Sequence, residues 1–266
     1  MKLKLKYLVA ALGLVASVPS FAAIADPTTP AGGGELFLVV WEQGVAGKTD
    51  QSFTFDTGLT FASFLANANT SQTMADILST DTTFQSFLAS SSLTDLQYAL
   101  IGGSTAAPAT LLTTVHVGDE SQVALGTNSQ ITGALAQLPT FIGAVNLTGT
   151  HASLANGESS NPTGSSAYFM DVNNPLNYFN NAFGGTFSNS NLIGVASEFT
   201  SLAKVTGAST KPGHEVVLPG VINFGLVGND YVLSYTVAAV PEPTGLGMAL
   251  AGMGVLGFIG LRRKQG

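Results

Sequence analysis

Apolar and polar residues alternate in several short stretches of the chain, a pattern typical of half-buried β-strands. Residues 35–41 are almost continuously apolar after Glu35, which predicts a buried strand. Residues 52–56 follow a glycine-bearing turn and alternate Phe with polar residues, so the two segments predict a hairpin with a long loop. Further strands are expected at 96–100, 112–117, 215–218, 221–227 and 231–237. Gly228-Asn229 is a favoured hairpin turn, which pairs the last two of these strands.

Two similar segments, 61–66 and 84–89, carry apolar residues at i, i+3 and i+4, which places them on one face of a helix. Asp81 is well placed to cap the second segment. We interpret the pair as amphipathic helices that pack on a sheet; the alternative is an aromatic ligand-binding face. Three other segments have weaker patterns: a helix at 131–142 interrupted near Pro139, a polar loop at 156–166, and a short helix at 173–183.

These patterns predict a mainly β fold with a sandwich-like sheet and several short α-helices, of the α+β class. The chain contains 16 Phe, six Tyr and one Trp among many Ser, Thr, Asn and Gly residues, which indicates a folded domain with an uncharged polar surface. No long linker divides the middle, so we expect one exported core domain at 26–239. One C-terminal transmembrane helix completes the prediction.

The N-terminal residues 1–25 have the three parts of a secretory signal peptide: a basic start, an apolar run and a box of small residues. Ala23-Ile24-Ala25 fits the small-x-small rule of signal peptidase and predicts Asp26 as the first mature residue. Ser20-Phe21-Ala22 offers an alternative cut. The chain is therefore expected to be exported by the Sec route.

The charges are distributed unevenly. Six of the nine basic residues lie in the two terminal segments, and residues 26–239 keep three lysines against 15 acidic residues, a net charge near −12. Such a domain lacks the cations that neutralise phosphates, which argues against nucleic acid as a partner and against anionic lipid headgroups. The chain has no cysteine, so disulfides and thiolate chemistry are excluded.

The C-terminal segment has three parts in a fixed order. Val240-Pro241-Glu242-Pro243 stays extended because its prolines disfavour helix and sheet pairing. Residues 244–261 carry no charge and, as a helix, would reach about 27 Å, enough to span a bacterial inner membrane. Arg262-Arg263-Lys264 then holds the end of the chain on the cytoplasmic side.

This order of parts resembles the PEP-CTERM sorting domain, a tail that is also catalogued as an ice-binding-protein C-terminal domain without implying ice binding. The resemblance implies processing by an exosortase near residues 240–243, a Gram-negative host that makes exopolysaccharide, and a final place at the cell surface or in the medium. Two features depart from the pattern: Thr244 follows the second proline directly, and six glycines interrupt the span. The alternative, a plain C-terminal anchor, does not explain Pro-Glu-Pro.

No local motif in the core indicates catalysis. The three histidines, His116, His151 and His214, are not part of a zinc-hydrolase or nucleophile-elbow pattern. We therefore expect no enzyme activity and name no catalytic residue.

A calcium ion is the one cofactor for which the sequence offers ligands. Asp171, Asn173 and Asp230 place oxygen ligands in turns, although the EF-hand order is broken by Pro175. The ordinary explanation is that Asn and Asp tolerate turn geometry.

The sequence thus favours a non-catalytic surface or matrix protein, associated with exopolysaccharide or biofilm. The alternative is a secreted hydrolase with the same tail. A cluster of acid, base and nucleophile in one cleft would favour the hydrolase, and an exposed aromatic or Asn/Thr-rich flat face would favour the matrix protein.

Overall fold

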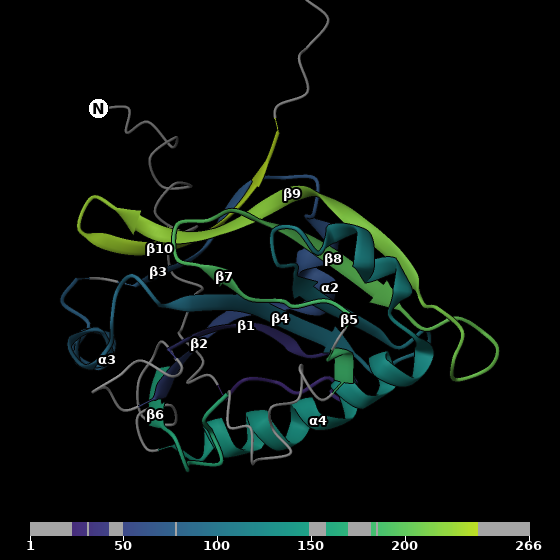
Figure 1. Ribbon diagram of the computed structural model, residues 1–266, viewed down its shortest axis with the longest axis horizontal. Helices are drawn as coiled ribbons and strands as arrows, with labels where there is room; N and C mark the ends of the chain where they lie inside the picture. The colour runs from purple at the N-terminus through teal and green to yellow at the C-terminus, as the bar shows by residue number, and fades with distance from the viewer. Residues whose placement is uncertain are drawn as a thin grey trace, which may run out of the picture.

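A ten-stranded antiparallel sheet organises the part of the chain that the structure describes (Figure 1). The computed structural model describes residues 23–30, 32–42, 50–77, 79–148, 158–169, 182–184 and 186–238. The strands run in the order β3-β10-β9-β8-β5-β4-β1-β2-β6, and β7 pairs with β4 outside this path. Their bounds are β1 (Glu35–Glu42), β2 (Gln51–Thr60), β3 (Gln72–Ile77), β4 (Gln97–Ser104), β5 (Thr110–Thr114), β6 (Glu158–Pro162), β7 (Asn191–Leu192), β8 (Ser197–Ala203), β9 (His214–Val227) and β10 (Asp230–Val237).

The predicted buried strand and its hairpin partner are confirmed as β1 and β2, which pair antiparallel with Val40 opposite Phe53. Both faces of β1 are covered. One face contributes Leu36, Leu38 and Val40 to one hydrophobic cluster, and the other contributes Phe37, Val39 and Trp41 to a second. Burial on both faces explains why the sequence of β1 is apolar without alternation.

The sheet curls so that its two ends face each other across the first cluster, which we call the inner core (Leu38, Phe53, Phe84, Phe224, Tyr235 and their neighbours). The ring of Phe84 lies 4.8 Å from that of Phe53 on β2 and 5.1 Å from that of Tyr231 on β10, measured between centroids. The predicted sandwich-like sheet is therefore corrected to one curled sheet. A sandwich would have two separate sheets, but here β5 pairs with β4 on one side and with β8 on the other, so the hydrogen-bonded ladder is continuous.

The two short amphipathic helices are confirmed as α2 (Phe61–Ala66) and α3 (Thr82–Ser90). Asp81 caps α3 as predicted, its carboxylate accepting a hydrogen bond from the backbone N–H of Phe84 at 2.8 Å. Phe64, Phe84 and Phe87 are buried in the inner core. Their burial supports the packing interpretation over an aromatic ligand-binding face.

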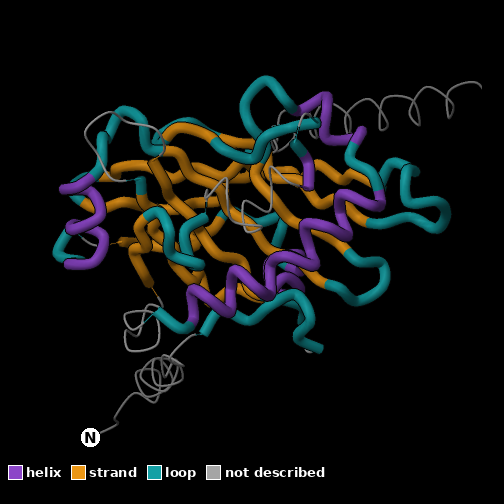
Figure 2. Tube along the Cα trace, turned by 60° about the horizontal axis from the view of Figure 1, so that its bottom comes forward, coloured by secondary structure: helices purple, strands orange, loops and turns teal. Residues whose placement is uncertain are grey.

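The other face of the sheet is covered by the long helix α4 (Asn128–Asn146), preceded by the 3-10 helix η1 (Glu120–Leu125) (Figure 2). Buried residues of α4 and the sheet form the second cluster, the outer core (Phe37, Trp41, Ile101, Leu135, Phe141 and their neighbours). The predicted interruption near Pro139 is wrong, because the helix runs through Pro139. Buried residues on both sides of the proline, Leu135 and Leu138 before it and Phe141 after it, hold the helix on the sheet.

Two further predictions are corrected. The polar segment 156–166 contains strand β6, which pairs with the edge of β2. Residues 215–218 and 221–227 belong to one strand, β9, because Gly220 continues the pairing with Val237 of β10. Most of the predicted helix at 173–183, and the whole predicted span at 244–261, lie outside the described residues. Among the residues that the structure does describe, none of the helices combines the length and apolarity needed to cross a membrane.

Candidate functional site

The C-terminal signal follows directly from a firmly paired strand. β10 pairs with β9 on one side and with β3 on the other. At its end, the backbone N–H of Val237 donates to the Ser71 hydroxyl at 2.8 Å, and that hydroxyl contacts the Val237 carbonyl at 3.4 Å. Val240, Pro241, Glu242, Pro243 and the basic residues Arg262, Arg263 and Lys264 lie outside the described residues. The last described strand, β10, therefore ends at Val237, close before the predicted sorting motif.

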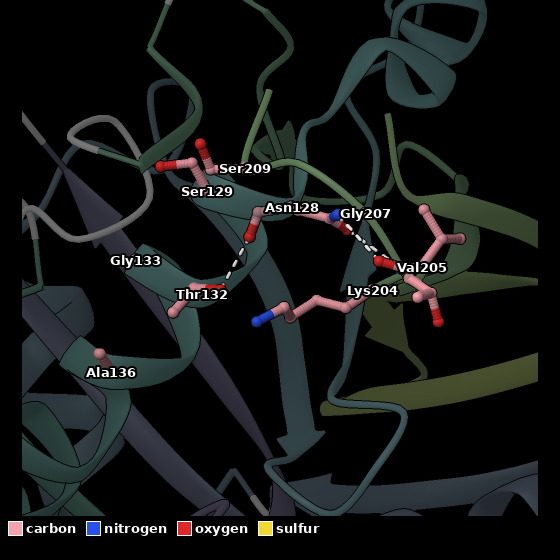
Figure 3. A pocket seen from close by; sticks show the side chains of 10 residues that line it. Asn128, Ser129, Thr132, Gly133, Ala136, Lys204, Val205, Gly207 and Ser209 are labelled. Atoms are coloured by element: carbon pink, nitrogen blue, oxygen red, sulfur yellow. Dashed lines mark hydrogen bonds between the residues drawn. The ribbon is translucent and has the colours of Figure 1, made fainter. Parts of the chain in front are cut away.

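A polar pocket lies between the first turns of α4 and the loop that joins β8 to β9 (Figure 3). Its volume is about 660 Å³. It is lined by Asn128, Ser129, Thr132, Gly133, Ala136, Lys204, Val205, Thr206, Gly207 and Ser209. With mostly polar lining residues, it is a candidate site for a polar ligand.

Asn128 holds the two walls of the pocket together. Its side chain is 3% exposed; its amide group donates to the carbonyls of Val205 at 2.9 Å and Ala208 at 3.0 Å, and its oxygen accepts from the N–H of Val205 at 2.9 Å. The backbone N–H of Ser129 donates to the Ser209 carbonyl at 2.9 Å. Because these bonds join the helix start to the loop, the pocket is preformed.

The start of α4 is fixed by a capping box. Thr127 accepts a hydrogen bond from the N–H of Gln130, and the Gln130 side chain accepts one from the N–H of Thr127 at 2.8 Å. Thr-x-x-Gln before an apolar run is a recognisable helix start, so the sequence does contain this signal. The opposite wall, residues 204–209, comes from a distant part of the chain.

The pocket offers hydrogen bonds and one positive charge. The lining carries the hydroxyl groups of Ser129, Thr132, Thr206 and Ser209, and the Lys204 side chain reaches toward the first turns of α4 (Figure 3). The Thr132 hydroxyl already donates to the Asn128 carbonyl at 2.8 Å, so its lone pairs remain as acceptors. The lining residues named above include no carboxylate and no imidazole. This set suits recognition of hydroxyl groups or of a single anionic group.

A second hollow of about 580 Å³ shares residues 204–206 with the first and is also lined by Thr105, Ala107, Pro108 and Ala109. The backbone N–H of Lys204 donates to the Ala109 carbonyl at 2.8 Å, which fixes the ridge between the two hollows. An extended ligand could therefore contact both hollows along one surface.

The two histidines that the structure describes, His116 and His214, do not come together. His116 is exposed just after β5, with its Nδ1 at hydrogen-bond distance from the Ser190 carbonyl. His214 is the exposed first residue of β9 and pairs with Ala203, the last residue of β8. The neighbour of His116, Val115, instead bonds to Glu198 near the start of β8. His151 lies outside the described residues.

The calcium candidates are only partly described. The Asp230 carboxylate accepts a hydrogen bond from the N–H of Ser79 at 2.7 Å, which accounts for one of its oxygens. Asp171 and Asn173 lie outside the described residues. Within the described ranges, no three or more His, Asp or Glu side chains group in a way that could hold a metal ion.

A buried carboxylate that the sequence did not single out lies on β2. Asp56 is 5% exposed; one oxygen accepts from the N–H of Gly58 at 2.8 Å, and the other has no hydrogen-bond partner among the described residues. The pKa of Asp56 is raised to about 7, chiefly because the carboxylate is buried; the Gly58 hydrogen bond opposes this rise, and the nearby charge of Glu35 adds to it. Asp56 can therefore change its charge near neutral pH.

Comparison with known proteins identifies the tail. The PEP-CTERM protein-sorting motif matches residues 239–264, as the order of parts predicted. This motif implies export, membrane-associated sorting by an exosortase, and a final place at the cell surface or outside the cell. Neither the curated proteins nor the solved structures contain a match to the chain.

Proposed function

We propose that the chain is a non-catalytic matrix protein, exported by the Sec route and sorted by an exosortase, whose domain associates with exopolysaccharide outside a Gram-negative cell. The observation that carries this proposal is the sorting motif at 239–264, since the family resemblance connects such tails with exopolysaccharide-producing bacteria. In this proposal, the polar surface of the domain makes the contacts with the exopolysaccharide.

The pocket supports a carbohydrate ligand. Sugars present several hydroxyl groups close together. The pocket lining places side-chain hydroxyls and the Lys204 ammonium group around a space of about 660 Å³. The net charge near −12 of residues 26–239 repels strongly acidic polymers. The favoured ligand is therefore a neutral or weakly acidic polysaccharide.

The sorting step is tested in the native host by replacing Pro241, Glu242 and Pro243 together with alanine. We expect a folded precursor that stays in the membrane fraction, because the changed residues belong to the sorting motif and follow β10, the last described strand, which ends at Val237. Gln265→Ala, beyond the matched residues, is the control and should be processed normally. Equal release of the triple variant and the wild type would reject sorting by this motif.

The binding step is tested by co-sedimentation of the exported protein with the exopolysaccharide of its host. We expect saturable binding that Ser129→Ala and Lys204→Gln together weaken at least several-fold. Thr70→Ala, at an exposed turn after α2, is the control and should bind as the wild type does. Absence of binding by the wild type would refute the proposal, and hydrolysis of the polymer that requires the folded domain would support the hydrolase alternative.

A further inference from the structure

The segment just before the predicted mature start is part of the folded domain. Ile24 is 2% exposed and belongs to the outer core. A leader that ended at Ala25 would carry this side chain away and leave its place in the core empty. Signal peptidase acts on the unfolded chain, so the fold does not block a cut there, but the rest of the domain is shaped to hold these residues.

Asn146, the last residue of α4, recognises the backbone of Ile24. The N–H of Ile24 donates to Oδ1 of Asn146 at 3.0 Å, and Nδ2 of Asn146 donates to the Ile24 carbonyl at 3.0 Å. The side chain thus pairs with both polar groups of one peptide residue. Without Ile24, both ends of this amide would lose their partners.

Ala25 is held equally well at the start of β1. Its N–H donates to the Glu35 carboxylate at 2.7 Å, and its carbonyl accepts from the N–H of Glu35 at 2.8 Å. The chain then passes so close to Gly34 that a Cβ there would lie 2.9 Å from the Asp26 carbonyl carbon and 3.0 Å from the Ala25 oxygen. Glycine at position 34 is therefore explained by the presence of residues 25–27.

We infer that signal peptidase cuts after Ala22, so that the mature protein begins Ala23-Ile24-Ala25. Ser20 and Ala22 supply the small residues that the enzyme needs before this bond. Ala23 is exposed, so the new ammonium group would remain in water. The inference depends on the proposed export and is independent of the proposed matrix role.

N-terminal sequencing of the exported full-length chain tests the cut directly. We expect Ala23 as the first residue. A first residue of Asp26 would overturn this inference and leave export intact, whereas a retained Met1 would overturn export itself.

Two leader variants form a matched pair, read by the precursor-to-mature size shift in a short labelling pulse that does not require folding. Ala22→Leu should slow the conversion of precursor to mature protein, because only the less used box Ala23-Ile24-Ala25 remains, and Ala25→Leu should leave its rate unchanged. The reverse result would place the cut after Ala25 and refute the inference.

Ile24→Ala provides a third readout, on the purified exported protein. If Ile24 is retained, its loss from the core should lower the melting temperature by about 5 °C or more. If the residue is removed with the leader, the variant and the wild type are the same molecule and must melt at the same temperature.

Discussion

The Tyr235 hydroxyl accepts a hydrogen bond from the backbone N–H of Gly220 at 2.9 Å and donates one to the Ala68 carbonyl at 2.7 Å. The tyrosine on β10 thereby joins β9 to the turn after α2. Its ring lies directly over Gly220, where a Cβ would be 2.6 Å from the ring carbon Cζ. Glycine is required here by the close approach of the ring.

We expect Gly220→Ala to lower the free energy of unfolding by about 1–3 kcal/mol, because the added methyl group must displace the buried Tyr235 ring. Urea denaturation of the exported protein measures the change. Gly143→Ala is the matched control, since Gly143 lies in α4 with nothing within 4 Å of the new Cβ. The control should stabilise by about 0.5–1 kcal/mol through helix propensity. Equal effects at the two sites would contradict the packing shown here.

Phe84 joins the two ends of the curled sheet, so its truncation should be costly. We expect Phe84→Ala to lower the free energy of unfolding by about 3–5 kcal/mol, because the side chain is fully buried between β2 and β10. Gln85→Ala, exposed on the same helix, should change it by less than about 0.5 kcal/mol. A small effect at Phe84 would mean that the two ends of the sheet do not depend on this contact.

The buried Asp56 should make the domain less stable as the pH rises. Its pKa is raised from 3.8 to about 7, so between these values the unfolded state loses the proton and the folded state keeps it. The stabilising contribution of protonated Asp56 is therefore fully present below about pH 4 and decreases as the pH rises to about 7. Above that pH, the free energy of unfolding is lower by up to about 4 kcal/mol.

Denaturation at pH 5 and pH 8 measures this fall, and Asp56→Asn should remove most of it. Asparagine keeps an oxygen for the Gly58 N–H and cannot ionise. Glu35 lies near Asp56, so Glu35→Gln should weaken the dependence without abolishing it. A pH dependence that is unchanged in Asp56→Asn would assign it to other groups.

The proline inside α4 provides a prediction of opposite sign. Pro139 has no N–H for the carbonyl of Leu135, one turn earlier in the helix. We expect Pro139→Ala to raise the free energy of unfolding by about 1–3 kcal/mol, measured by urea denaturation. A loss of stability would show that packing of the proline ring outweighs the missing hydrogen bond.

The sequence predicted those elements whose own residues determine their structure. β1 is apolar on both faces, β9 and β10 meet at a favoured turn, and α3 begins at a capping aspartate. The sorting tail was predictable for the same reason, because an enzyme and a membrane recognise it as a linear signal.

Elements that depend on distant neighbours were missed. β6 consists of Glu, Ser, Asn and Pro residues and becomes a strand because the edge of β2 is available to pair with it. The pocket needs Asn128 to meet Val205 and Ala208, a contact that no local pattern encodes. Burial of Asp56 likewise results from the packing around β2 and leaves no trace in its neighbours along the chain.

The position of β10 determines how the protein responds to tension. A pull on the tail reaches the C-terminal end of β10 first, and the hydrogen bonds to β9 and β3 run across that strand. A load along the strand shears both ladders at once, whereas a load across it breaks the hydrogen bonds one after another. While the tail holds the protein at the membrane, drag from flowing liquid or from an attached polymer would therefore be carried first by β10, a strand with a neighbour on each side.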